Sequence, residues 1–221
     1  MSEPRYFSLD YTERAVLRDG TVVRLRLLAP EDKLALRRGF ERLSAESRYA
    51  RFLAPKTTLN DDELRYLCEI DQDNHFALAA IREEGDGHGE PIGLGVARFI
   101  RFADRPDVAE AAIAVADEAQ HQGLGKLLFL RLVAAAAERG IRTFRTEVLG
   151  SNIGMASLLK AISPEREIEV SSGVMSIEMP LPNVAPTEKA APAGPMYQLF
   201  RAAAENVVEW TDAVRRIWRR E

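Results

Sequence analysis

The residues Gln120, Gly123 and Gly125 form the pattern Gln-x-x-Gly-x-Gly, which stands between a β-rich stretch and a long apolar stretch. Glycines at the start of a helix let a ligand approach the backbone closely, and consecutive backbone N–H groups there attract anions. Lys126 adds a positive charge directly after the second glycine. The pattern therefore predicts a cradle for a pyrophosphate group.

Two other phosphate-binding signatures are missing from this segment. It lacks the Gly-Lys-Ser/Thr ending that holds magnesium in nucleoside triphosphatases, and it lacks the Gly-x-Gly-x-x-Gly pattern of Rossmann domains. A pyrophosphate bound without a metal favours coenzyme A or a dinucleotide as the ligand. Taken alone, the string is also compatible with a glycine-containing turn before a helix.

The remaining residues that could do chemistry are sparse. His75, His88 and His121 are widely spaced and show no metal-ligand pattern, and the single cysteine, Cys68, excludes an intrachain disulfide. We expect His75 at the start of a strand and Cys68 in the core. Residues 171–173 (Ser-Ser-Gly) lack the strand–turn–helix context of a hydrolase nucleophile, which favours a plain turn.

Hydrophobic periodicity, capping residues and turn residues predict the elements around the cradle. The expected elements are a hairpin over 16–28 around Asp19-Gly20, a helix from Pro30, a helix from Asn60 to Leu67, strands over 76–81, 92–102 and 109–115, a helix over 124–139, a strand over 143–149, a helix over 152–162 and two strands within 167–181. This order predicts an α/β (α+β) fold in which helices flank a mixed central sheet.

The apolar stretch over 124–139 predicts a helix buried against that sheet. Arg131 and Glu138 are expected to mark a narrow solvent-facing stripe, and Gly140 is expected to end the helix.

Composition limits the class of protein. The 221 residues are 46% hydrophobic and 29% charged, with 30 Lys and Arg against 34 Asp and Glu, which gives a net charge of −4. No global positive field exists to attract nucleic acid. The N-terminus does not look like a signal peptide, and no apolar stretch is long enough to cross a bilayer, so we expect a soluble cytoplasmic protein.

The composition changes after Leu181. We expect a domain over 1–182, a Pro/Ala-rich linker over 183–195, and an amphipathic helix over 196–221 that carries Trp210 and Trp218. Docking of this helix on its own domain or in a homo-oligomer is expected. Membrane adsorption through its arginines is the alternative, which its acidic residues oppose.

The arrangement of strand, Gln-x-x-Gly-x-Gly, buried helix and second strand resembles the GNAT superfamily of acyl-CoA N-acyltransferases. The resemblance covers roughly residues 16–181 and includes R-L-L-A-P-E-D at 26–32. Within the superfamily, S-R-Y-A-R-F at 47–52, residues 63–71 and A-E-A-A-I-A-V-A-D-E-A-Q at 109–120 look like the Pat-type protein lysine acetyltransferases.

The resemblance implies acetyl-CoA as co-substrate, no metal, and a set of residues for each role. Glu110 matches the general base, and its apolar neighbours are expected to shield it partly from water. The backbone of β-strand residues would pair with the pantetheine arm, the glycine loop would wrap the pyrophosphate, and an asparagine would bond the pantetheine or acyl region. These cofactor-binding residues are Ile113, Val115, Gln120, His121, Gln122, Gly123, Leu124, Gly125, Lys126 and Asn152.

The chain departs from the family pattern in two ways. Many relatives carry a tyrosine seven residues after the asparagine, where it protonates the leaving thiolate, but this chain has Leu159. The thiolate then leaves unprotonated, or a water serves. His121 and Gln122 stand where many relatives have a glycine and a basic residue, which predicts weaker phosphate pairing.

The expected function is an N-acetyltransferase that moves an acetyl group from acetyl-CoA to an amine, with a protein lysine as the preferred acceptor. A small-molecule amine is the alternative acceptor. A non-catalytic acyl-CoA-binding module that acts through the C-terminal helix is a third possibility, against which Glu110 weighs.

Overall fold

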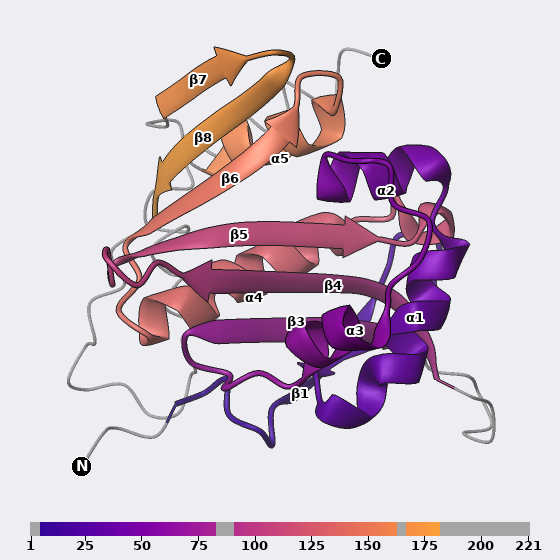
Figure 1. The fold of residues 1–221 in the computed structure, drawn as a ribbon. Helices are drawn as coiled ribbons and strands as arrows, with labels where there is room; N and C mark the ends of the chain where they lie inside the picture. Colours follow the sequence, from indigo (N-terminus) through magenta and orange to yellow (C-terminus); the bar gives the residue numbers. More distant parts are fainter. Residues whose placement is uncertain (1–4, 83–90, 163–166, 182–221) are drawn as a thin grey trace. The chain divides into compact units, whose positions relative to one another are not determined.

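The described residues form one mixed sheet of 8 strands, in the order β1-β2-β3-β4-β5-β6-β8-β7 (Figure 1). The computed structural model describes residues 5–82, 91–162 and 167–181. The strands are β1 (Thr12–Val16), β2 (Val22–Leu27), β3 (His75–Arg82), β4 (Ile92–Arg101), β5 (Val108–Val115), β6 (Thr143–Leu149), β7 (Glu167–Ser171) and β8 (Val174–Pro180). The helices of this part are α1 (Lys33–Arg42), α2 (Ala45–Phe52), α3 (Asp61–Cys68), α4 (Leu124–Glu138) and α5 (Ile153–Ile162).

Strand direction confirms the mixed sheet. Neighbouring strands are antiparallel throughout, except for β5 and β6, which are parallel. A parallel pair needs a crossover connection, and α4 provides it between these two strands (Figure 1).

The hairpin at the start of the fold turns at the expected place but begins earlier than expected. Gly20 has a φ of +86°, and Asp19 accepts a hydrogen bond from the Thr21 N–H at 2.9 Å. The first strand covers Thr12–Val16, upstream of the expected hairpin start at Val16. Its residues alternate between exposed and half-buried, so it lacks the apolar run that would have revealed it.

The three helices α1, α2 and α3 lie on one face of the sheet, where two were expected (Figure 1). The additional helix is α2, which the Ser44 hydroxyl caps by accepting the Ser47 N–H at 3.1 Å. It has no buried residue, so no apolar stripe reveals it in the sequence. The capping pair at α3 is confirmed, since Asn60 and Glu63 accept each other's backbone N–H.

Helix α4 covers the opposite face and is buried along most of its length (Figure 1). It ends as expected, with Gly140 at a φ of +73°. The expected solvent-facing stripe is wrong. Arg131 is only 8% exposed and forms an ion pair with Glu13 of β1, and the Glu138 carboxylate accepts the backbone N–H groups of Tyr6 and Phe7.

Other expectations are met or fall outside the described residues. Cys68 is fully buried, His75 begins β3, and Ser172 and Gly173 turn the chain from β7 to β8 with positive φ angles. His88, the linker over 183–195 and the helix over 196–221 lie outside the described residues. Among the helices that are described, none is long and apolar enough to span a bilayer.

Candidate active site

The strands β5 and β6 separate soon after they meet. They pair in parallel over only three positions, Val108 to Glu110 of β5 opposite Thr143 to Arg145 of β6. Beyond Glu110, β5 keeps its partner β4 on one side but has no strand partner among the described residues on the other. Figure 1 shows β6 diverging upward from β5 at this point. Residues of both strands line a cavity at this wedge-shaped separation, among them Glu110 and Ile113 of β5 and Thr146 of β6.

The backbone of β5 directs polar groups into this wedge. At the two ends of the β4–β5 ladder, the Phe102 N–H bonds the Val108 carbonyl and the Ala116 N–H bonds the Leu94 carbonyl. Bonded and non-bonded pairs alternate along an antiparallel ladder, so the even-numbered residues of β5 bond β4. Ile113 and Val115, which are odd-numbered, therefore turn their N–H and C=O groups toward the wedge.

Glu110 lies where the wedge begins. Side chains alternate across a strand, so Glu110 shares a face with Ala112 and Ala114, which line a cavity together with residues of α1 and α2. Glu110 is exposed, so the expected shielding by its apolar neighbours is wrong. The reason is geometric: Ala109 and Ala111 are buried on the opposite face of the strand.

The glycine loop leaves its N–H groups available. Gly123 is the N-cap of α4 at a φ of +90°, no side chain caps the helix, and the first intrahelical bond is donated by Leu127 to the Gly123 carbonyl. The N–H groups of the first helical turn, from Leu124 to Lys126, thus have no intrahelical acceptor. Lys126 is exposed beside them.

The β1–β2 turn orients the loop that precedes α4. The Arg18 N–H bonds the Gln122 carbonyl at 3.2 Å, and the Arg18 guanidinium bonds the His121 carbonyl at 3.5 Å. In a trans peptide the N–H points opposite to the carbonyl, so the N–H groups of Gln122 and Gly123 face away from Arg18. Arg18 therefore places a positive charge beside the loop, and no pattern in the sequence predicted this role for Arg18.

The loop has space where a pyrophosphate would lie. A Cβ added at Gly125 would meet no atom closer than the Val115 side chain at 3.8 Å, so the packing of the protein itself does not require a glycine there. Unused N–H donors with open space in front of them fit a pyrophosphate. His121 has a φ of +60°, a conformation that favours glycine, in keeping with the glycine of many relatives at this position.

Gln120 is used inside the protein rather than in the cradle. Its side-chain amide donates to the Val115 carbonyl at 3.2 Å, to Ser47 Oγ at 3.1 Å and to Asp117 Oδ1 at 2.9 Å. These bonds tie α2 and the end of β5 to the loop. Gln120 therefore positions the loop, and the Val115 N–H stays directed into the wedge while its carbonyl is occupied.

Asn152 lies on the far side of the wedge, at the start of α5. Its Oδ1 accepts the Met155 N–H at 3.0 Å, so it caps the helix and has only its amide Nδ2 left to offer a ligand. Asn152 lines one cavity together with Glu110 and Ile113, so the structure brings these three predicted residues together. Leu159 is fully buried and contributes no proton donor.

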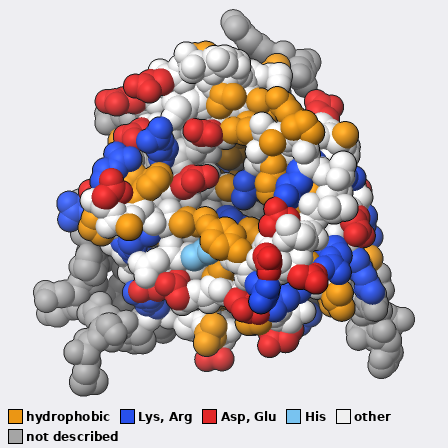
Figure 2. All heavy atoms as spheres, viewed as in Figure 1, with side chains coloured by type: hydrophobic (Ala, Val, Ile, Leu, Met, Phe, Trp, Pro, Cys, Tyr) orange, Lys and Arg blue, Asp and Glu red, His pale blue; other side chains and the backbone are white. Residues whose placement is uncertain are grey.

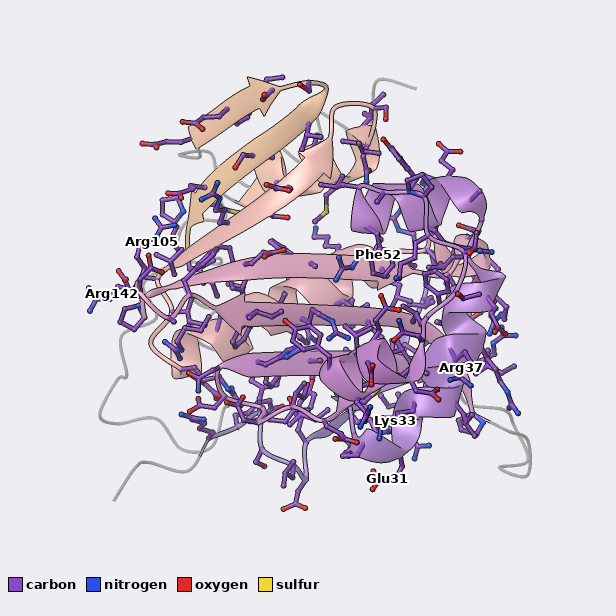
Figure 3. All side chains as sticks on the ribbon, in the orientation of Figure 1. Glu31, Lys33, Arg37, Phe52, Arg105 and Arg142 are labelled. Atoms are coloured by element: carbon purple, nitrogen blue, oxygen red, sulfur yellow. The ribbon has the colours of Figure 1, made fainter. Side chains whose placement is uncertain are left out.

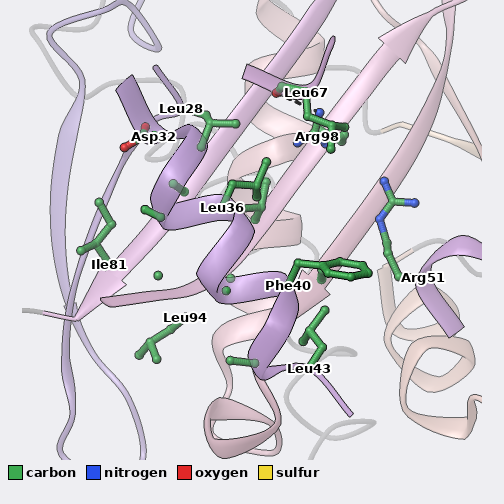
Figure 4. A pocket seen from close by; sticks show the side chains of 18 of the residues that line it. Leu28, Asp32, Leu36, Phe40, Leu43, Arg51, Leu67, Ile81, Leu94 and Arg98 are labelled. Atoms are coloured by element: carbon green, nitrogen blue, oxygen red, sulfur yellow. Dashed lines mark hydrogen bonds between the residues drawn. The ribbon is translucent and has the colours of Figure 1, made fainter. Parts of the chain in front are cut away.

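A second cavity, on the α1–α3 face, adjoins the first. The two share Arg51 and Phe52 of α2 and Ala112 of β5, so they meet beside Glu110. Phe52 is labelled near β5 in Figure 3. The second cavity is lined mostly by apolar residues of α1, β3 and β4, and it also contains Arg98 of β4 (Figure 4). In Figure 2 Lys and Arg side chains lie in a hollow near the middle of this face.

Arg98 is a buried cation to which the sequence analysis gave no role. Its Nη1 lies 3.2 Å from the Leu67 carbonyl and 3.0 Å from His75 Nε2. Because a guanidinium only donates, His75 accepts through Nε2 and is neutral. Burial and the positive charge of Arg98 lower the pKa of His75 to about 4. A charged residue within the apolar run of β4 was the signal in the sequence.

Arg51 interacts electrostatically with both Glu110 and Arg98. Burial lowers the pKa of Arg51, and the negative charge of Glu110 opposes that shift. Burial, and then the charge of Arg51, lower the pKa of Arg98 to about 10. Arg51 belongs to the S-R-Y-A-R-F segment, which supports the family resemblance, but the segment alone does not predict that Arg51 lies in the site.

Among the described residues, no group of three or more His, Cys, Asp or Glu side chains could hold a metal ion.

Comparison with known proteins gives consistent matches to this fold and site. A family profile described as "Acetyltransferase (GNAT) family" matches residues 35–161, which include the wedge, the glycine loop and Asn152. Acetyltransferase Pat of Mycolicibacterium smegmatis is 29% identical over 76% of this chain and 48% of its own length, so the chain spans about half of that relative. Acetyltransferase PA5475 of Pseudomonas aeruginosa is 30% identical over 66% of this chain and 76% of its own length.

Solved structures agree with the sequence matches. The GNAT domain of S. lividans PAT superposes with a TM-score of 0.67 at 30% identity, covering 77% of this chain and 97% of that domain. A cAMP-binding acyltransferase from Mycobacterium smegmatis gives a TM-score of 0.54 at 25% identity, over 90% of this chain and 55% of its own. With the profile match across the wedge and the loop, these relatives confirm the resemblance, and the chain belongs to the GNAT family of acetyltransferases.

Proposed function

We propose that this chain transfers the acetyl group of acetyl-CoA to an amine, and that the preferred acceptor is the ε-amine of a protein lysine. The observation that carries the proposal is the separation of β5 from β6 beyond Glu110. It places a carboxylate, an unpaired strand edge and an uncapped helix N-terminus around one opening.

Each part of the opening suits one part of acetyl-CoA, which supplies an acetyl thioester when bound. The N–H and C=O of Ile113 and the N–H of Val115 are placed to pair with the pantetheine amides, as an added strand would. The N–H groups from Gln122 to Lys126 are placed to bind the pyrophosphate. The Nδ2 of Asn152 can donate to the pantetheine or acyl carbonyl.

Glu110 supplies the acid–base chemistry that an amine acceptor needs. A lysine amine with a pKa of about 10.4 is almost entirely protonated at neutral pH and cannot attack. Glu110 accepts one proton of the ammonium group, directly or through one water, as the nitrogen bonds the thioester carbon, and the second surplus proton of the nitrogen leaves to water. The carbon–sulfur bond then breaks, and the sulfur leaves as a thiolate or takes a proton from water, because Leu159 has none to give.

A protein lysine is favoured over a free amine by the subfamily resemblance. The S-R-Y-A-R-F segment and the strand with Glu110 look like those of Pat-type lysine acetyltransferases. A small-molecule amine acetyltransferase would share the wedge and the loop, so the acceptor must be identified by experiment.

The test is to incubate the protein with labelled acetyl-CoA and either a mixture of native proteins or a panel of small amines. Glu110→Gln run in parallel gives the background of uncatalysed lysine acetylation. We expect labelled lysines in a small number of proteins that depend on Glu110. If only small amines are labelled, the acceptor is a small-molecule amine and not a protein lysine. If the protein binds acetyl-CoA but labels neither proteins nor small amines, a non-catalytic acyl-CoA-binding module is favoured.

A further inference from the structure

The cavity on the α1–α3 face holds more positive than negative charge. Its ionisable lining residues are Arg26, Asp32, Arg51 and Arg98. Arg26 and Asp32 form a two-bond ion pair, with contacts of 2.6 and 2.7 Å, and neutralise each other. Arg51 and Arg98 are left, and the rest of the lining is mainly aliphatic and aromatic.

Arg98 is buried without a counter-ion. Its side chain is 5% exposed, and both of its bonds, to the Leu67 carbonyl and to His75, are made through Nη1 with neutral partners. Within the described part of the chain, no carboxylate forms an ion pair with it. Burying an unpaired charge costs free energy unless a ligand compensates it. The Leu67 bond explains part of its placement, because a cation suits the C-terminal end of a helix such as α3.

Arg51 and Glu110 lie next to this charge. Arg98 stands opposite Ala112 in the β4–β5 ladder and is therefore a diagonal neighbour of Glu110 on the same face. Backbones of such diagonal neighbours are about 7–8 Å apart. Arg51 approaches from α2 on the same side of the cavity as Arg98 (Figure 4), and it lines both cavities.

We propose that Arg51 and Arg98 form a subsite for a carboxylate of the acceptor, which they hold beside the amine that Glu110 deprotonates. The inference rests on the proposed amine acetylation and adds a requirement for the acceptor: a carboxylate within about one amino-acid length of the reacting amine. That carboxylate comes either from an Asp or Glu next to the lysine in a protein or from the α-carboxyl group of a free amino acid.

The chemistry of the two arginines suits this ligand. Guanidinium groups bind carboxylates through paired N–H donors, and such charge-assisted bonds gain strength where water is excluded. A carboxylate would offset part of the positive charge of the two neighbouring guanidinium groups. The aliphatic lining of the cavity beyond them can accept apolar atoms of the acceptor.

Binding of product analogues tests the subsite without relying on catalysis. Nα,Nε-diacetyl-lysine and Nα,Nε-diacetyl-lysinamide differ only in the carboxylate, and neither carries a reactive amine. We expect the full-length protein to bind the carboxylate about 10- to 100-fold more tightly, as measured by calorimetry. Arg51→Gln and Arg98→Gln should each remove most of this preference. A glutamine at position 98 can still donate to the Leu67 carbonyl, and circular dichroism checks that each variant is folded.

Arg65→Gln is the matched control, because Arg65 is an exposed residue of α3 that pairs with Asp62 and is not among the residues that line the cavity. It should keep the preference of the wild type. Equal binding of the two analogues by wild type, or a preference that survives in both cavity variants, would overturn the subsite.

Acceptor kinetics distinguish the two sources of the carboxylate and separate this inference from the proposed function. One pair is Nα-acetyl-lysine and Nα-acetyl-lysinamide, and the other is a lysine peptide with a neighbouring Glu and the same peptide with Gln. A preference in kcat/KM within the first pair indicates a free amino acid, and one within the second indicates a protein acceptor. If no lysine is acetylated but the analogues still bind with the Arg-dependent preference, the lysine proposal fails and the carboxylate subsite stands.

Discussion

Glu110 stands where β5 leaves β6, on the face of the sheet that α2 covers. Glu110→Gln keeps the shape of the side chain but removes its ability to accept a proton. We expect kcat to fall by about 10²–10⁴ at neutral pH, with the affinity for acetyl-CoA kept. Higher pH should restore part of the rate, because more of the amine is then neutral in solution. Steady-state kinetics from pH 6 to pH 10 measure both effects.

Glu147 of β6 provides the comparison, because it is the other carboxylate that lines the cavity with Glu110. If Glu147→Gln shows the large loss and Glu110→Gln keeps full activity at pH 7, the proton acceptor is Glu147 and the assignment of Glu110 is wrong.

Gly125 tests the pyrophosphate cradle. The protein leaves room for a Cβ at this position, so Gly125→Asp should fold, yet it would place a negative charge and bulk in front of the N–H groups. For wild type, acetyl-CoA at 100 times its Kd should raise Tm by about 5–10 °C. We expect Gly125→Asp to abolish this shift, measured by thermal denaturation. Gly125→Asn has the same bulk without the charge and should keep part of it. A full shift in folded Gly125→Asp would remove the loop from the cofactor site.

The contact of α4 with β4 places the glycine loop at the end of β5. Gly95 of β4 allows it, because a Cβ there would lie 2.9 Å from the Leu128 side chain of α4 and 3.1 Å from the Ala114 carbonyl. Gly95→Ala should lower the free energy of unfolding by about 1–3 kcal/mol, because α4 must shift or β4 must move. Urea denaturation measures the loss.

Gly93 in the same strand is the matched control for Gly95. A Cβ at Gly93 meets nothing within 4 Å, so Gly93→Ala should change the free energy of unfolding by no more than about 0.5 kcal/mol. Equal effects of the two substitutions would show that helix–sheet contact is not what requires glycine at position 95.

The stability of the whole molecule should depend on pH through His75. The pKa of His75 is about 4 in the folded protein and 6.5 in its ordinary state, because burial and Arg98 disfavour the protonated ring. As pH falls below about 6.5 the unfolded chain binds a proton that the folded chain does not bind until about pH 4. The free energy of unfolding therefore decreases across this range. We expect a loss of about 2 kcal/mol, reduced from the full shift because the ring is only partly buried.

His75→Gln isolates this effect, because its side-chain oxygen can still accept a bond from Arg98 but does not titrate. Urea denaturation between pH 7 and pH 4.5 should show a shallower decrease for the variant than for wild type. Equal slopes would place the pH dependence on another group.

At the scale of the whole molecule, local patterns in the sequence were sufficient for much of the fold. The buried α4, the glycine loop before it, the Asn60–Glu63 capping pair and the turn at Asp19-Gly20 each follow from residues close together in the chain. Their periodicity, caps and φ preferences are local properties, so they need no tertiary information. Helix α2 and strand β1 were not predicted from the sequence, because neither carries a continuous apolar pattern.

The tertiary structure decided what surrounds Glu110. Strands β5 and β6 separate after three paired positions, and this depends on how two distant segments pack. Arg51, Arg98 and Asn152 come from α2, β4 and the start of α5, and only the packing of these distant segments brings them together around two adjoining cavities. The burial of Arg131 could not be predicted from its neighbours in the sequence for the same reason, because its ion-pair partner Glu13 lies 118 residues away. The sequence by itself therefore determined most of the elements and the glycine loop, whereas long-range packing decided the exposure and the neighbours of the residues around Glu110, because these depend on segments far apart in the chain.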